Sequence, residues 1–207
     1  KSQVEAYHKP FIEETGVKLI SEDFSGGLAE IKAQVEANKV RWDLVSLDKP
    51  DIVRGCAEGL LETVDPAILP AGSDGTPADE DFISGPIHEC AVNTIVVSTV
   101  LTVNEDAFSG KAAPSKLVDL FDLANYPGRR ALQKMPQGNL EWALIADGVE
   151  PQNVYETLET SEGRARAFAK LDTIKSDVIW WTTGAQPPQM LADKEVVMAS
   201  AFNGRIH

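Results

Sequence analysis

Hydrophobic residues in the first third of the chain follow two periods, that of helices and that of buried strands. Helical spacing occurs in three segments, residues 2–15, 28–38 and 52–61. Gly16 is a usual stop for the first of these helices. Short, mostly apolar segments at 17–20 and 42–47 are typical of buried strands. Strands that alternate with helices predict a parallel sheet covered by helices, and the prolines, glycines and acids of residues 62–81 predict a loop.

The rest of the chain repeats this alternation. A run of mostly β-branched residues at 91–103 exceeds the usual strand length of about 5–6 residues. It predicts two strands, or one strand that leaves the first unit and enters the second. Helices are expected at 115–123, 139–147, 151–158, 162–175 and 188–192, and strands at 129–133, 178–181 and 195–202. The sequence therefore predicts an α/β protein of two units joined by a β-rich crossover.

Composition and charge narrow the possible functions. The chain has 207 residues, of which 43% are hydrophobic, and no stretch approaches the roughly 18 consecutive apolar residues of a membrane-spanning helix. Nucleic acid is not expected as a partner, because 19 basic against 32 acidic side chains give a net charge of −13. The first residue is not Met, and no closing element follows the last predicted strand. We expect a piece of a longer, exported precursor that lacks material at both ends.

The two cysteines, Cys56 and Cys90, are too few for a disulfide scaffold and lack the spacing of a metal or redox pair. One disulfide and two buried free thiols fit the sequence about equally well. The neighbours Gly55 and Glu89 favour the disulfide slightly, because neither cysteine lies inside an apolar run.

Motifs for catalysis or cofactor binding are missing from the sequence. The three histidines, His8, His88 and His207, have no second histidine or cysteine at the spacing of a metal pair. The sequence contains no nucleophile elbow, no dinucleotide-binding glycine motif and no Walker lysine motif. We therefore expect no metal, no cofactor and no enzymatic activity.

Side chains suited to ligand binding follow three predicted strands. Trp180 and Trp181 end one strand, where alternation places one indole in a core and the other towards a cleft. Residues 202–205 follow the last strand, and their arginine offers a planar fork to a carboxylate, although a surface ion pair is the simpler alternative. Asp48 closes an earlier strand, where a helix N-cap is the simpler alternative. Because open α/β sheets bind ligands at the carboxyl ends of strands, the three places together favour a binding site.

The order and spacing of several short motifs resemble the solute-binding proteins of ABC importers, in particular the spermidine and putrescine branch. The resemblance covers essentially all 207 residues. It rests on Glu14-Thr15-Gly16-Val17-Lys18, Trp42-Asp43-Leu44-Val45, Cys56-Ala57-Glu58-Gly59-Leu60-Leu61, Glu89-Cys90, Thr94-Ile95-Val96-Val97-Ser98-Thr99, Tyr126-Pro127-Gly128-Arg129-Arg130, Ala185-Gln186-Pro187-Pro188-Gln189 and Ala201-Phe202-Asn203-Gly204-Arg205-Ile206. It implies the two-lobed, type II-like fold of a periplasmic binding protein, truncated at both ends, which closes on its ligand like a hinged clamp. The lobes implied are 1–95 and 96–201, with 202–207 starting a return crossover.

The resemblance also implies roles for individual residues. Asp48 matches a ligand contact after a first-lobe strand, and Gln137 falls near an acidic contact of the second lobe. Phe202 matches an aromatic residue that stacks on the ligand, and Trp181 lies in a stretch that lines the cleft. The ligand-binding residues expected are Asp48, Gln137, Trp181, Phe202, Asn203 and Arg205. In such a protein Cys56 and Cys90 look like a disulfide of the first lobe, consistent with the periplasm.

Arg205 departs from the polyamine pattern, in which an acidic or small residue is usual at this place. A cationic arginine beside an ammonium group is repulsive. A ligand with an amine at one end and a carboxylate at the other, such as 4-aminobutyrate, suits Asp48 and Arg205 together.

The sequence therefore predicts a monomeric periplasmic protein that delivers a small amine-containing solute to the permease subunits of an ABC importer. The solute is a polyamine, such as putrescine or spermidine, or an ω-amino acid. Two other classes stay open: an enzyme on the same two-lobed scaffold, and a ligand sensor whose closed form is read by a receptor. Turnover of a ligand would favour the enzyme, whereas only the partner distinguishes the sensor.

Overall fold

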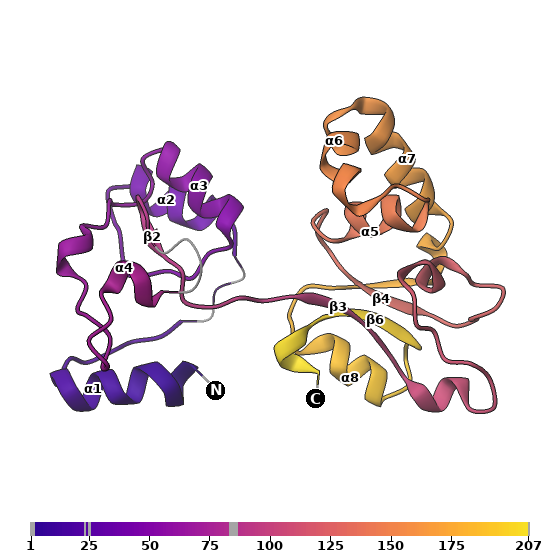
Figure 1. Cartoon of the computed structure of the whole chain (residues 1–207), viewed down its shortest axis with the longest axis horizontal. Helices are drawn as coiled ribbons and strands as arrows, with labels where there is room; N and C mark the ends of the chain where they lie inside the picture. The colour runs from indigo at the N-terminus through magenta and orange to yellow at the C-terminus, as the bar shows by residue number, and fades with distance from the viewer. Residues whose placement is uncertain (1–2, 23, 25, 83–86, 207) are drawn as a thin grey trace. The chain divides into compact units, whose positions relative to one another are not determined.

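Two compact units make up the protein (Figure 1). The computed structural model describes residues 3–22, 24, 26–82 and 87–206. The first unit comprises Lys1–Ile68 with Ile87–Ala91, and the second comprises Leu69–Pro86 with Val92–His207. The lobe boundaries expected from the sequence, at residues 95 and 201, stay a prediction.

Short helices dominate the first unit. Its elements are η1 (Val4–His8), α1 (Lys9–Thr15), α2 (Ala29–Glu36), α3 (Lys49–Ala57), η2 (Pro66–Ile68) and a hairpin of β1 (Ile87–His88) with β2 (Ala91–Val92). The three helices predicted in the first third are confirmed, although α3 starts earlier than expected. Gly16 ends α1 with a φ of 69°, a left-handed conformation that glycine adopts without a steric penalty.

Two segments predicted as strands join no sheet in the described part of the first unit. Residues 17–20 and 42–47 are irregular, with a bend at Asp43, and they pair with no strand among the described residues. Their apolar side chains stay accessible, since Ile20 is 77% and Leu44 94% exposed. The prediction of a parallel sheet is therefore wrong for the part of this unit that the structure describes. A strand forms only where a neighbouring backbone completes its hydrogen bonds, and hydrophobicity alone does not supply one.

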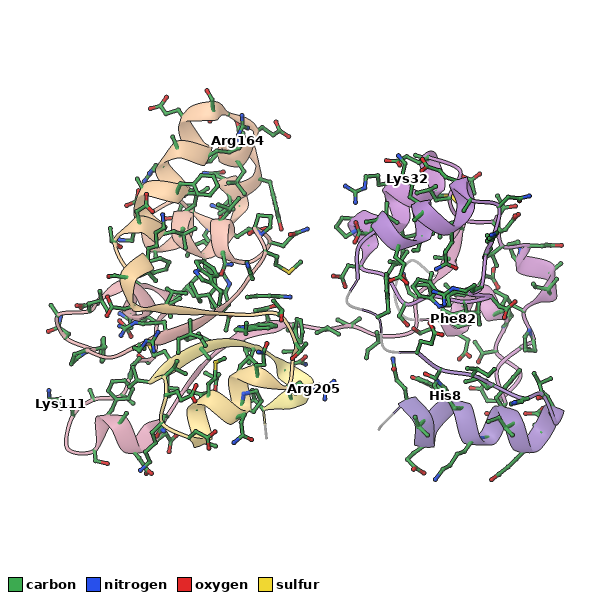
Figure 2. The ribbon with its side chains drawn as sticks, turned by 180° about the vertical axis from the view of Figure 1, so that it is seen from behind. His8, Lys32, Phe82, Lys111, Arg164 and Arg205 are labelled. Carbon is green, nitrogen blue, oxygen red and sulfur yellow. A yellow bond between two sulfur atoms is a disulfide. The ribbon has the colours of Figure 1, made fainter. Side chains whose placement is uncertain are left out.

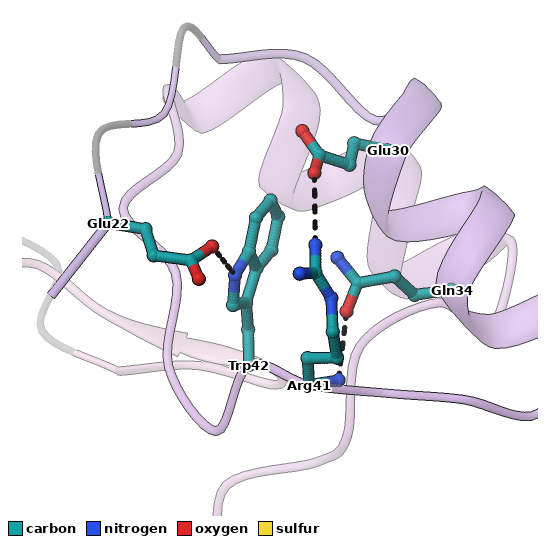
Figure 3. A network of polar contacts seen from close by, with 5 residues as sticks. All are labelled: Glu22, Glu30, Gln34, Arg41 and Trp42. Atoms are coloured by element: carbon teal, nitrogen blue, oxygen red, sulfur yellow. Dashed lines mark hydrogen bonds and ion pairs between the residues drawn. The ribbon is translucent and has the colours of Figure 1, made fainter. Parts of the chain in front are cut away.

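Side chains connect the second of these segments to its surroundings (Figure 3). The Trp42 indole Nε1 donates a hydrogen bond to Glu22 Oε2 at 2.9 Å. The backbone N–H of Arg41 donates to Gln34 Oε1 at 2.9 Å. The guanidinium of Arg41 lies 3.5 Å from Glu30 Oε1. Because both charged side chains of this pair are more than half exposed, the ion pair adds little stability.

A four-stranded sheet forms the centre of the second unit. Its strands are β3 (Thr99–Val103), β4 (Arg130–Gln133), β5 (Val178–Trp181) and β6 (Met198–Phe202), in the order β3-β6-β4-β5. β4 runs parallel to β5 and β6, and β3 runs antiparallel to β6. Helices cover both faces, with α5 (Asn139–Ala146), α6 (Val154–Glu159) and α7 (Ser161–Asp172) on one side and α8 (Gln186–Ala192) on the other (Figure 1).

Most elements predicted for the second unit are confirmed. The strand at 178–181 has the expected bounds, and the strands at 129–133 and 195–202 are shorter. The helix expected at 115–123 is instead the 3₁₀ helix η4 (Leu117–Phe121). The β-branched run at 91–103 divides into β2 and β3, as one of the two interpretations predicted. The remaining short elements are α4 (Ala78–Asp81), η3 (Glu105–Phe108), η5 (Pro151–Asn153), η6 (Lys175–Asp177) and η7 (Asn203–Arg205).

Two hydrophobic clusters stabilise the second unit. The larger one includes Leu120, Leu132, Leu144, Ile174 and Met198, all at most 1% exposed. The smaller one contains Ala131, Trp181, Leu191, Val196 and Ala199. Because Leu191 belongs to α8 and Leu144 to α5, each face of the sheet has apolar contacts with its covering helix.

Arg130 is a fully buried charge at the start of β4. Its Nε donates to the carbonyl of Leu120 at 3.0 Å, and an Nη donates to that of Tyr126 at 2.6 Å. The carbonyls of Asp122 and Gly128 accept further hydrogen bonds from the same guanidinium. Burial lowers the pKa of the guanidinium, while Asp177 and Asp122 act in the opposite direction. The side chain therefore fixes the 120–128 loop against the sheet.

The disulfide implied by the resemblance is confirmed. Cys56 in α3 is bonded to Cys90, with the two Cα atoms 5.9 Å apart. The backbone N–H of Val64 donates to the carbonyl of Glu89 at 2.8 Å, beside this bond. The disulfide thus ties the short Ile87–Ala91 segment to the rest of the first unit.

Candidate functional site

The carboxyl ends of β4, β5 and β6 lie at one edge of the sheet in the second unit. Gln133 at the end of β4 pairs with Trp181 at the end of β5. The antiparallel β3 begins at this edge, where Thr99 pairs with Phe202. Four of the residues predicted to bind ligand, Trp181, Phe202, Asn203 and Arg205, therefore come together on neighbouring segments. This is the edge at which open α/β sheets bind ligands.

Trp181 is the buried support of this edge. Its side chain is fully buried, and its Nε1 donates a hydrogen bond to Ser200 Oγ at 3.2 Å. The backbone N–H of Gln133 donates to the same hydroxyl oxygen, also at 3.2 Å. A buried indole N–H needs such a partner. The burial of Trp181 does not fit the predicted direct contact with ligand and assigns its indole to the core.

The Phe202 ring packs against the indole of Trp181. The two rings are 5.4 Å apart between centroids and meet edge to face at 86°. Phe202 is partly exposed, unlike the residues that precede it in β6. Gly184, in the turn after β5, lies against the same ring. An aromatic ring is thus fixed at the edge of the sheet with part of its surface accessible.

Asn203 connects the edge to the crossover segment before β3. Its backbone N–H donates to the Ser98 carbonyl at 2.9 Å. Its side-chain Oδ1 accepts a hydrogen bond from the Ser98 backbone N–H at 3.1 Å. Since this oxygen is already engaged, the observed contacts of Asn203 are structural, and its predicted contact with ligand stays a prediction.

Arg205 is the exposed cation of this edge. It ends η7, and Figure 2 shows its side chain at the surface of the segment that follows β6. Among the residues that the structure describes, none forms an ion pair or hydrogen bond with its guanidinium. A Cβ atom placed on Gly184 would lie 3.8 Å from Arg205 Nε and 2.9 Å from the Phe202 ring. The guanidinium and the ring therefore flank the same small residue.

Gln137 lies in the loop between β4 and α5, and its side chain is exposed. The residue that organises this loop is Asn139, which is 5% exposed and was not singled out from the sequence. Its Nδ2 donates to the carbonyls of Gln133 and Met135, each at 2.7 Å. An asparagine one residue after Gly138, at the start of a predicted helix, was the available signal. Whether Gln137 contacts ligand stays a prediction.

Trp180 takes the opposite orientation to Trp181, as the strand alternation predicts. It is 41% exposed and contributes to an apolar pocket of about 370 Å³. The pocket is lined by Lys134, Met135, Pro136, Asn139, Leu140, Phe168, Leu171 and Trp180. Trp180 is therefore the accessible indole, whereas Trp181 is the one that was predicted to bind ligand.

Asp48, in the first unit, occupies the N-cap position of α3 with an extended backbone. Its backbone carbonyl accepts hydrogen bonds from Asp51 and Ile52 at 2.9 and 3.0 Å. Its exposed carboxylate forms no capping hydrogen bond. Asp48 is therefore at the helix N-cap, as the simpler alternative predicted, but its side chain does not cap the helix. The carboxylate remains accessible at the positive end of a helix.

The family follows from a comparison with known protein families. The family model described as "Bacterial extracellular solute-binding protein" matches residues 6–207. The chain belongs to the bacterial extracellular solute-binding proteins. The resemblance to solute-binding proteins is therefore confirmed at this level. Because the family binds solutes, the expectation that the chain is not an enzyme is confirmed at the level of the family.

Several relatives of this solute-binding protein are described with a ligand. A gamma-aminobutyric acid-binding protein of Pseudomonas aeruginosa is 42% identical over 99% of this chain and 56% of its own length. The structure of MotA from A. tumefaciens B6, in complex with glucopine, matches with a TM-score of 0.85 and 31% identity, over 99% of this chain and 60% of that one. A structure described as a GABA receptor matches with a TM-score of 0.80 and 34% identity, over 99% and 59%. The α/β fold of a periplasmic binding protein is thus confirmed, and the chain spans about 56–60% of the length of these relatives.

The polyamine branch is a more distant match. The spermidine/putrescine-binding protein PotD of Streptococcus pneumoniae is 16% identical, with a TM-score of 0.64 over 95% of this chain and 58% of that one. Identity this low shows the fold alone. In the described part of the chain, all helices are too short or too polar to span a membrane.

Proposed function

We propose that this solute-binding protein takes up a zwitterionic ω-amino acid of the 4-aminobutyrate type in the periplasm and delivers it to an ABC importer. The observation that carries the proposal is the exposed Arg205 beside the Phe202 ring. A guanidinium with no partner among the described residues is suited to a carboxylate, which it binds through two parallel hydrogen bonds. The ligand for which the Pseudomonas aeruginosa relative is named, gamma-aminobutyric acid, supports the same chemical class.

The aromatic ring would serve the apolar part of such a ligand. Phe202 keeps part of its surface accessible while Trp181 and Gly184 hold its position. A fixed ring binds methylene groups without losing side-chain freedom at the moment of binding. Trp181, being buried, acts through Phe202 rather than on the ligand.

Asp48 is the proposed partner of the ammonium group. Its carboxylate is exposed and free of a capping hydrogen bond, which leaves it available for a cation. A polyamine, with cations at both ends, would suit Asp48 but would meet a like charge at Arg205. The exposed cation at Arg205 therefore favours a ligand that carries a carboxylate.

A thermal-shift titration of the complete protein with 4-aminobutyrate, putrescine and spermidine tests the proposal. A ligand that binds only the folded state raises its stability by about 2.7 kcal/mol at a hundredfold excess over Kd. We expect a shift with 4-aminobutyrate and none with the two polyamines. A shift with the polyamines alone would contradict the assigned role of Arg205, and no shift with any of the three ligands would overturn the proposal.

Substitution of Arg205 locates the carboxylate contact. Arg205→Gln removes a charge-assisted pair and should weaken 4-aminobutyrate binding by about 10- to 100-fold. The matched control is Arg129→Gln, an exposed arginine at the opposite end of β4, which should leave the affinity unchanged. Equal effects of both substitutions, measured by isothermal titration calorimetry, would show that overall charge and not the site is responsible.

A further inference from the structure

Gly184 occupies a place at the sheet edge where a larger residue does not fit. A Cβ atom built on it would lie 2.9 and 3.2 Å from Cδ2 and Cε2 of the Phe202 ring. Real Cβ atoms essentially never approach another heavy atom to 2.9 Å, so one partner would have to move. The backbone of Gly184 is outside the left-handed region, unlike that of Gly16 or Gly138. The lack of space, and not the backbone conformation, therefore explains the glycine.

The ring cannot yield towards the core. Trp181 lies against it edge to face at 5.4 Å, is fully buried, and is held by its hydrogen bond to Ser200. Packing at protein interior density leaves no room for a displaced ring on that side. A ring pushed from Gly184 must therefore move away from Trp181, towards its exposed side.

The turn that carries Gly184 is also fixed. The backbone N–H groups of Thr182 and Thr183 both donate to Gln186 Oε1, at 2.8 and 2.9 Å. The backbone N–H of Gln186 donates back to the Thr183 carbonyl at 3.0 Å. One side chain thus holds the turn between β5 and α8. The turn does not relax easily to make room for a methyl group.

We propose that Gly184 is a specificity-determining position, which keeps the Phe202 ring back against Trp181 and thereby sets the ligand length that fits beside Arg205. The inference rests on the proposed function, in which Arg205 takes the carboxylate and Phe202 the methylene groups. The Cβ atom of a side chain at this position would lie 3.8 Å from Arg205 Nε and would displace the ring into the space of the methylene groups. It should therefore favour a ligand with a shorter chain.

The test measures affinities of the complete protein for three ω-amino acids: 3-aminopropanoate, 4-aminobutyrate and 5-aminopentanoate. Gly184→Ala should shift the ratio of dissociation constants about tenfold towards 3-aminopropanoate, since one methylene in a tight pocket is worth at least that. Phe202→Leu, which removes the ring edge, should shift the ratio towards 5-aminopentanoate. The matched control is Gly204→Ala, at the same edge, because a Cβ atom there meets nothing within 4 Å and the backbone is not left-handed.

A double-mutant cycle separates displacement of the ring from general loosening. Once Phe202→Leu has removed the ring, Gly184→Ala should change the ratio less than twofold, because contacting residues are not additive. An unchanged ratio in Gly184→Ala, or equal changes with and without the ring, would overturn the inference while leaving the proposed function in place. If Gly184→Ala does not fold, the opposite shift expected of Phe202→Leu decides the matter alone. Failure of the unsubstituted protein to bind any of the three would overturn both proposals.

Discussion

The two units differ in what holds them together. The second unit has a four-stranded sheet with helices on both faces and two hydrophobic clusters. In the described part of the first unit, Leu28 and Ile31 are the buried large hydrophobic residues, while Ile20, Val40, Leu44 and Ile68 are more than 60% exposed. A disulfide, exposed ion pairs and the contacts of Trp42 take the place of a large core there.

The difference shows how strongly strands depend on distant partners. Residues 42–47 are as apolar as many central strands, yet no sheet includes them. Residues 178–181 form a strand because β4 runs beside them in register over all four residues. Apolar helices and turns form locally in both units, but among the described residues a sheet of more than two strands forms in the second unit alone.

The largest expected effect is the loss of Arg130 in the second unit. Arg130→Met keeps the volume and removes the donors to four backbone carbonyls. Buried acceptors without partners are costly, so the second unit should lose about 3–5 kcal/mol of its free energy of unfolding. Hydrogen exchange read by mass spectrometry should show faster exchange throughout β4 and η4, with the first unit unchanged.

The matched control is Arg129→Met, one residue earlier, where the side chain is exposed. It should change the exchange rates little, because surface substitutions usually stay within about 0.5 kcal/mol. Faster exchange in both units after Arg130→Met would contradict the separation of the chain into independently stabilised units.

Removal of the disulfide should affect the first unit selectively. The bond joins residues 34 apart in the sequence, and closing a loop of this size stabilises a protein by about 3–4 kcal/mol in the chain-entropy model. With so few buried hydrophobic side chains, the first unit has little else to offset the loss. Cys56→Ser combined with Cys90→Ser should accelerate exchange in α2 and α3.

The second unit provides the internal control for this experiment, because the sequence has two cysteines and both belong to this bond. Reduction of the unsubstituted protein should reproduce the double substitution. Equal loss of protection in β4 and α5 would mean that the two units unfold as one, contrary to the comparison drawn from their cores.

Local patterns predicted the second unit well and the first unit only in part. The hydrophobic period alone predicted the strand at 178–181 and the helices at 139–147 and 162–175. Residues 17–20 and 42–47 were predicted as strands in the same way as residues 178–181, but no described strand lies beside them. A single sequence does not reveal whether a neighbouring strand is present. The residues alone left a disulfide and two free thiols about equally possible, because the geometry of the fold decides whether two cysteines meet. The disulfide was expected only through the resemblance.

The sequence predicted where the candidate site lies better than it predicted which side chains are accessible there. Strand ends identified the edge at Trp181, Phe202 and Arg205, because ligand sites follow from the topology of α/β sheets. Which of two adjacent indoles is buried depends on how the helices pack, so alternation predicted one of each kind without saying which. Asn139 and Gly184 escaped notice because their roles lie in packing and backbone contacts.

The smallest expected effect is a pH dependence that belongs to the second unit. The backbone and side-chain N–H groups of Asn125 donate to the carboxylate of Asp122, at 2.9 and 2.6 Å, and these bonds hold its pKa below the usual 3.8. The folded state therefore binds fewer protons than the unfolded state in this range, so the contribution is fully present above about pH 4 and is lost as the pH falls through the lowered value. Asp122→Asn should lower the stability slightly at pH 7, and the difference from the unsubstituted protein should vanish near pH 2.

Asp43→Asn is the control, because it removes the same charge at an exposed position of the first unit without this contact. It measures the relief of charge repulsion in a protein of net charge −13. Urea unfolding at pH 2–7 measures both variants, and a difference that persists at the lowest pH would mean that the side chain contributes through packing instead of charge.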